Sequence, residues 1–214
     1  MVILITRPKY DPGTNYLFYW SKFVISEAEK RGNKVLDLQE EKANKINLTS
    51  YIHKHKPQFI FFNGHGNKNL IMGQDNEVLV EANNNEVLLS ESIVYARSCE
   101  CAEGLGSKCV EKGTIAFLGY KKKYTIGYTS EKITRPLEDP VAKLFLEPSN
   151  LIPISLLKGK TVEQAHLKSQ KMMSDNFLFM LSSKASAEQK DSAPFLWRNK
   201  KYQTVLGNKN ARLV

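Results

Sequence analysis

The sequence predicts an α/β fold with a mostly parallel central sheet and helices on both faces. Short apolar runs bounded by turn residues, which are typical of buried strands, alternate along the first half with longer amphipathic stretches. Strands that alternate with helices in this way form parallel sheets. The functional crevice of such a sheet lies at the carboxyl ends of its strands.

Length and composition fit this class. The chain has 214 residues, 42% of them hydrophobic and 25% charged. These are values of an ordinary globular protein, with enough apolar material for one core. We expect a single domain over residues 1–214, without internal repeat or linker.

The elements of the first half follow from the pattern in chain order. Gly32 ends the first helical stretch and Pro57 stops the second. Residues 68–89 break the alternation with a hairpin-like pattern, which we expect as an insertion on the sheet edge. Strands are expected at residues 2–6, 34–38, 59–63, 92–96 and 114–118, and helices at 16–30, 48–56 and 105–112.

The second half is more helical. We expect a strand at 124–128 and then a mobile loop over the polar, proline-broken stretch 129–139. A helix follows from about Pro140. Thr161 and Gln164 form a capping-box pattern that predicts another helix, to about Met173. Residues 177–182 prolong the helical region, and an apolar segment at 202–206 closes the chain.

Charge and cysteine content bound the function. The first ten residues resemble a strand rather than a signal peptide, and no window is apolar enough for a membrane span. The three cysteines are an odd number and do not indicate a set of disulfide bonds. We therefore expect a cytoplasmic protein with no membrane contact. The net charge is +9, but outside 121–123 and 198–201 the lysines are dispersed among glutamates, which disfavours nucleic acid as a partner.

Two predicted strands end in residues that can carry chemistry. FIFFNGHG leads to His65 and Gly66, and SIVYARSCECAEG leads to Cys99. Because neighbouring parallel strands end at the same edge, these residues can meet although they are 34 positions apart. A cysteine nucleophile needs a nearby proton carrier, which His65 supplies, and donors for the oxyanion, for which the amides of Gly66 and Cys99 are suited.

These motifs resemble the CHAT family of caspase-like (clan CD) cysteine peptidases. The family's strand ending in His-Gly is similar to FFNGHG, and its Ser-Ala-Cys-Glu-Thr is similar to ARSCEC. Further similarity runs through EGLGSKCVEKGTIAFLGY, LLKGKTVEQAHLKSQKMM and SAPFLWRNKKYQTVLGN, so that it spans about residues 59–207. The resemblance implies a caspase-like three-layer fold and a cysteine endopeptidase that cleaves a protein substrate with a Cys99–His65 dyad and no cofactor.

Two departures from the family pattern bear on the site. Cys101 stands where the family usually has threonine, so it is the fallback nucleophile. Arg97 stands where the family often has a small residue, at a position that helps form the pocket for the residue before the scissile bond. With Arg7 at the end of the first strand, it predicts binding of an acidic side chain. The alternative is that an internal carboxylate holds Arg97, and Glu100, Glu103 and Asp139 are the candidates.

Other readings remain beside the peptidase. A zinc site at His65 and the three cysteines is disfavoured because Cys-x-Cys lacks the usual ligand spacing, so we expect no metal. A catalytically silent interaction or regulatory module with the same fold is the main alternative. The resemblance also implies a separate activating or recruiting partner protein, because the family often carries a helical-repeat region that this sequence lacks.

Overall fold

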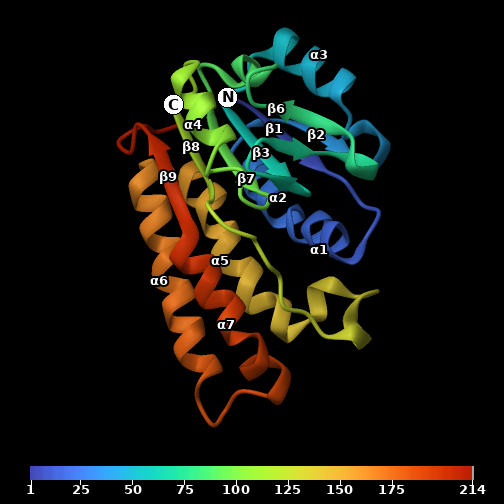
Figure 1. Cartoon of the computed structure of the whole chain (residues 1–214), viewed down its shortest axis with the longest axis vertical. Helices are drawn as coiled ribbons and strands as arrows, with labels where there is room; N and C mark the ends of the chain where they lie inside the picture. Colours follow the sequence, from blue (N-terminus) through green and yellow to red (C-terminus); the bar gives the residue numbers. More distant parts are fainter. Residues whose placement is uncertain (214) are drawn as a thin grey trace.

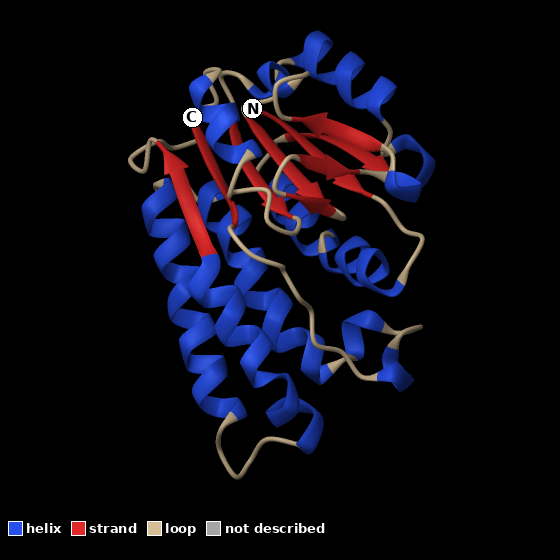
Figure 2. Cartoon of the chain, in the orientation of Figure 1, coloured by secondary structure: helices blue, strands red, loops and turns tan. Residues whose placement is uncertain are grey.

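The computed structural model describes residues 1–213 and centres on a six-stranded sheet (Figures 1 and 2). The strand order is β2-β1-β3-β7-β8-β9, and every neighbouring pair is parallel except β8 with β9. The strands are β1 (Val2–Arg7), β2 (Lys34–Gln39), β3 (Phe59–Asn63), β7 (Ile93–Arg97), β8 (Ala116–Tyr120) and β9 (Gln203–Gly207). The predicted α/β fold is confirmed.

Helices cover both faces of the sheet. On one face lie α1 (Pro12–Trp20), α2 (Lys22–Lys30) and α5 (Pro140–Leu157). Helices α6 (Val162–Met180) and α7 (Ala187–Tyr202) pack with α5 and extend beyond the sheet (Figure 1). The other face carries α3 (Lys45–His55), α4 (Leu105–Glu111) and a small antiparallel sheet of β4 (Gly66–Asn67), β5 (Leu70–Met72) and β6 (Val78–Glu81).

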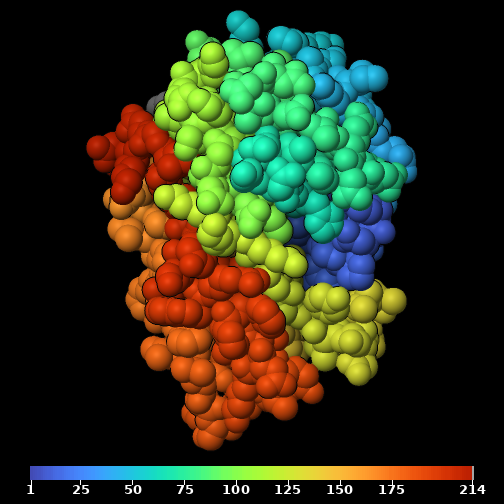
Figure 3. All heavy atoms as spheres, in the orientation of Figure 1, coloured from blue at the N-terminus to red at the C-terminus, as the bar shows by residue number. Residues whose placement is uncertain are grey.

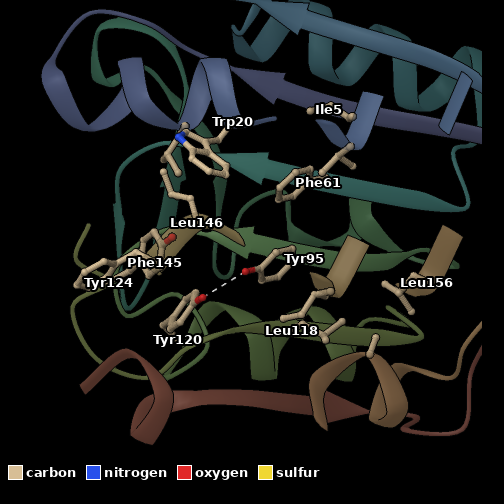
Figure 4. Close-up of a cluster of buried hydrophobic side chains, with 14 of the residues drawn as sticks. Ile5, Trp20, Phe61, Tyr95, Leu118, Tyr120, Tyr124, Phe145, Leu146 and Leu156 are labelled. Carbon is tan, nitrogen blue, oxygen red and sulfur yellow. Dashed lines mark hydrogen bonds between the residues drawn. The ribbon is translucent and has the colours of Figure 1, made fainter. Parts of the chain in front are cut away.

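The strands alternate between two cores. Phe59 and Phe61 of β3 face one core, whereas Ile60 and Phe62 face the other. Because both faces are covered, the strands are continuous apolar runs rather than alternating ones. Figure 4 shows the first core, where Phe61 and Tyr95 lie on adjacent strands with ring centroids 5.3 Å apart.

Residues 68–89 form the predicted hairpin, but this hairpin does not lie at the edge of the central sheet. β5 and β6 pair with each other and not with the central sheet. Their apolar residues Ile71, Leu79 and Val80 are fully buried in the second core. The expectation of an edge insertion was wrong, because these side chains give the hairpin an apolar face that packs over the sheet.

The helix expected at 16–30 divides at Ser21. The Ser21 hydroxyl donates to the carbonyl of Leu17 at 2.6 Å, a local bond that competes with regular helix geometry. The first helix also begins earlier than expected, at Pro12. Asp11 caps it, and its carboxylate accepts the amide of Thr14 at 2.8 Å.

The strand expected at 124–128 is absent, and this expectation was wrong. β9 pairs antiparallel with β8 and takes that edge, with Gln203 opposite Tyr120. Residues 121–128 instead run as an irregular segment, here called the strap, whose Thr125 backbone bonds to the side chain of Asn199.

The stretch 129–139 forms two short 3-10 turns, Ser130–Lys132 and Pro136–Glu138. Asp139 accepts the Thr129 amide at 2.8 Å and the hydroxyl of Tyr16 at 2.5 Å. The Trp20 indole donates to the Pro136 carbonyl at 3.0 Å. The side-chain amide of Asn15 also donates to the Ile133 carbonyl at 2.9 Å, so the stretch is tied to α1 at its middle as well as at its ends.

No helix in the described part of the chain combines the length and apolar character needed to cross a bilayer.

Candidate active site

The carboxyl ends of β3 and β7 bring His65 and Cys99 to one edge of the sheet. The two strands pair in parallel, with Asn63 opposite Arg97. His65 and Cys99 each follow two residues after this pair, so the loops that carry them leave the sheet side by side. Both residues line the same pocket, which has a volume of about 350 Å³.

His65 is held by an acidic partner from a third strand end. Its Nε2 lies 2.5 Å from Oδ2 of Asp11, and its carbonyl accepts the Met72 amide at 2.9 Å. Burial alone raises the pKa of Asp11, but hydrogen bonds from Thr14 and His65 outweigh it and hold that pKa below its ordinary value. A charged carboxylate at this place orients the imidazole.

Asp11 was not among the predicted site residues. The signal was an Asp-Pro pair at the start of a helix, four positions beyond the end of the first strand. Asp is a preferred N-cap and Pro a preferred first helical residue. Because β1 neighbours β3, that helix start had to lie near His65.

Cys99 is partly buried beneath the strap. Its Sγ lies 3.6 Å from the carbonyl oxygen of Tyr124, with geometry in which the thiol can donate. Burial raises the pKa of the Cys99 thiol, while the bond at Tyr124 and the charge of Lys123 lower it in part. The protonated thiol therefore prevails near neutral pH, and a base must accept its proton for it to act as a nucleophile.

The other two cysteines lie in the opposite core. Cys101 and Cys109 are fully buried on the α4 side of the sheet, whereas Cys99 packs against the α1 side. Burial raises the pKa of Cys101 to about 12. This separation favours Cys99 over Cys101 as a nucleophile. Within residues 1–213, no three His, Cys, Asp or Glu side chains gather to form a metal site.

Two glycines allow the loops to approach closely. A Cβ at Gly66 would lie 2.7 Å from the Leu70 carbonyl and 3.1 Å from Cβ of Ser98, the residue before Cys99. Gly64 has φ +146°, and a Cβ there would lie 2.6 Å from the Met72 carbonyl. Only glycine fits both places, and Gly66 lies against the loop of Cys99 as an oxyanion donor would need.

The two arginines predicted to bind substrate are used inside the protein. Arg97 is fully buried, and its guanidinium donates to Asn63, Asn150 and Ser21 at 2.6, 2.9 and 2.8 Å. These partners are neutral, unlike the carboxylates considered from the sequence. Arg7 is 4% exposed and pairs with Asp37 of β2. Neither arginine lines the pocket, so their predicted substrate-binding role has no support from this arrangement.

The pocket itself is mainly apolar. Leu17 of α1 forms one wall, and Tyr124, Ile126 and Tyr128 of the strap form another. Lys123 is the only lysine or arginine among its lining residues. A pocket of this kind has room for an apolar group of a ligand beside the thiol.

Comparisons with known proteins agree on the fold. The Arg-specific cysteine proteinase gingipain R matches with a TM-score of 0.65 at 9% identity, covering 99% of this chain and 47% of that chain. The complex of the pro- and mature domains of RgpB from Porphyromonas gingivalis matches with a TM-score of 0.61, also at 9% identity, covering 98% and 47%. The chain thus spans about half the length of these proteins. No protein-family model and no curated sequence matches it.

Proposed function

We propose that this chain is a cysteine endopeptidase of the caspase-like type, related to the CHAT peptidases that its motifs resemble. Cys99 is the nucleophile and His65 the general acid and base. The amides of Gly66 and Cys99 are the oxyanion donors. The caspase-like fold of the structural neighbours supports this proposal at the level of architecture.

One observation carries the proposal. His65 and Cys99 stand at equivalent places after two hydrogen-bonded parallel strands, and both line one pocket at the carboxyl edge of the sheet. That edge is where α/β folds bind ligands. Asp11 adds a carboxylate that can orient the imidazole.

The chemistry follows from these groups. The Cys99 thiol passes its proton to His65 as Sγ bonds to the scissile carbonyl carbon, and the carbonyl oxygen becomes an oxyanion. The imidazolium, stabilised by Asp11, then gives that proton to the leaving amine as the C–N bond breaks. Water, deprotonated by His65, hydrolyses the thioester and restores the thiol.

A silent module with the same fold is the second candidate. The observation that favours it is the environment of Cys99, whose thiol faces the Tyr124 carbonyl under the strap and whose pKa is raised by burial. In the peptidase reading, the same contact is a resting state that substrate or an activating partner protein displaces.

A covalent cysteine probe separates the two candidates. A peptide chloromethyl ketone that reacts only with a catalytic dyad should label wild-type protein and should not label Cys99→Ala or His65→Ala. Cys101→Ala is the matched control, because it removes a buried thiol from the same loop and should keep labelling. Both dyad variants should lose cleavage of unfolded casein while their unfolding midpoints stay near that of the wild type. Cleavage by folded Cys99→Ala protein would contradict the proposal.

A further inference from the structure

Two basic segments that are far apart in the sequence meet beside Cys99. β8 and β9 pair antiparallel, and the Lys121 amide donates to the Tyr202 carbonyl at 2.9 Å. Beyond this, Asn199 accepts the Thr125 amide at 3.1 Å and donates to the Thr125 carbonyl at 2.6 Å. Residues 120–125 therefore run alongside residues 198–203, and in Figure 3 the yellow-green chain near residue 120 lies against the red C-terminal part.

This juxtaposition gathers six cations on one surface, here called the basic surface. They are Lys121, Lys122, Lys123, Arg198, Lys200 and Lys201. The three lysines of the strap and Lys201 are exposed, and the other two are partly exposed.

The basic surface has few internal counter-ions. Within the described chain, Lys122 is the only one of the six with a carboxylate at ion-pair distance, from Glu103 at 3.1 Å. Like charges held together on one surface repel each other and attract anions. An unneutralised surface of this kind therefore favours an anionic partner.

The basic surface is continuous with the candidate active site. Lys123 lines the pocket that contains Cys99. Arg198 donates to the hydroxyl of Thr125, another residue that lines this pocket. A peptide whose scissile bond lies at Cys99 would thus pass over the basic surface.

Two aromatic side chains of this region have a lysine over the ring. Nζ of Lys200 lies 4.9 Å from the ring centre of Trp197, and Nζ of Lys201 lies 5.4 Å from that of Tyr202. Proteins that bind single-stranded nucleic acid stack bases on free aromatic faces. Since cations already occupy a position over these two rings, acidic side chains, which need only the cations, fit this surface better than stacked bases.

We propose that the basic surface binds acidic residues of the substrate protein next to the scissile bond. This inference rests on the proposed peptidase function, and it assigns the acidic preference to positions beside the residue that enters the pocket. Carboxylates of the substrate pair with the free cations at an exposed site, so the attraction is salt-dependent.

Binding is measured first, with Cys99→Ala protein and fluorescent peptide pools that have acidic, neutral or basic flanks on either side of a random centre. We expect the acidic pool to bind at least about tenfold more tightly than the neutral pool, with the preference shrinking as salt rises. Lys200→Glu with Lys201→Glu should abolish that preference. Lys34→Glu with Lys42→Glu is the matched control, with the same change in net charge beside β2 at the opposite edge of the sheet; it should keep the preference.

The outcomes separate this inference from the function on which it rests. Equal binding of the three pools, or equal loss in both double variants, overturns the inference. So does a single-stranded oligonucleotide that binds more tightly than the acidic pool and displaces it. Cleavage of peptides by wild-type protein without preference for acidic flanks overturns the inference but leaves the peptidase standing. Acidic preference in binding, without cleavage or probe labelling, supports the surface and contradicts the peptidase.

Discussion

The imidazole of His65 and the carboxylate of Asp11 are joined by a 2.5 Å contact that links the end of β3 to the start of α1. One carboxylate thus has two tasks, since it also caps the helix through the Thr14 amide. The two tasks can be separated by mutation because asparagine caps helices as well as aspartate does.

Asp11→Asn should therefore keep the fold and lose activity. We expect kcat/KM to fall on the order of 100-fold, because the imidazole loses its orienting charge. Asp11→Ala should in addition lower the free energy of unfolding by about 0.5–2 kcal/mol through loss of the cap. Peptide cleavage and urea unfolding measure the two effects. Equal activity of Asp11→Asn and wild-type protein would show that His65 does not depend on this carboxylate.

The same pair makes stability depend on acid. The pKa of Asp11 is lower in the folded protein than its ordinary value of 3.8. The ionised Asp11 carboxylate therefore contributes fully to the free energy of unfolding above pH 3.8. That contribution is lost as the pH falls through the lower pKa of the folded state. Urea unfolding of wild-type and Asp11→Asn protein should be measured at about pH 3 and about pH 7. Between these values the free energy of unfolding should fall more for the wild type than for the variant. An equal fall in the free energy of unfolding for both proteins would show that Asp11 does not contribute to the pH dependence.

Thiol reactivity should rise steeply in the alkaline range. Because burial raises the pKa of Cys99 above its ordinary value of 9.0, the iodoacetamide labelling rate should increase about tenfold per pH unit from neutral pH to beyond pH 9. Lys123→Ala should shift the curve to higher pH, since Lys123 lowers that pKa. Mass spectrometry of the folded protein should find label on Cys99 and not on Cys101 or Cys109. A plateau reached below pH 8 would mean that a thiolate already exists at rest.

Arg97 should matter for stability rather than for substrate choice. Arg97→Ala leaves Asn63, Asn150 and Ser21 without their donor and opens a cavity, so we expect a loss of roughly 3 kcal/mol or more in the free energy of unfolding. Arg97→Lys keeps part of the bonding and should fold well enough for assay. Its cleavage preference, measured with a peptide library, should equal that of the wild type. A changed cleavage preference would show that Arg97 helps to select the substrate.

The pocket should select an apolar residue before the scissile bond. Leu17, Ile126 and the tyrosines of the strap present apolar surface, and each buried methylene adds about 0.8 kcal/mol. In a peptide library, Leu or Phe at this position should exceed Asp by about tenfold or more. Ile126→Glu should shift the preference toward Lys and Arg, while Val87→Glu, exposed at the far side of the sheet, is the control. A wild-type preference for Asp would contradict the apolar assignment.

The sequence pattern predicted the parallel strands and the edge where they end, because buried strands are continuous apolar runs whatever their neighbours. Other features depended on distant contacts. α7 was not predicted, although Ser186 and Gln189 form a capping box that could have revealed it. The supposed strand at 124–128 failed because β9 occupies the edge. The partners of Arg97 come from three separate elements, which local patterns do not specify.

The hydrogen bonds between the Asn199 side chain and the Thr125 backbone can form only late in biosynthesis. His65 and Cys99 leave the ribosome long before α7 and β9 are made, and at the usual rate of synthesis the interval is several seconds. Throughout that interval the strap has neither Asn199 nor β9 to hold it, so the apolar wall of the pocket is not yet fixed. A ribosome-bound chain would therefore carry His65 and Cys99 without the finished wall of the pocket that they line.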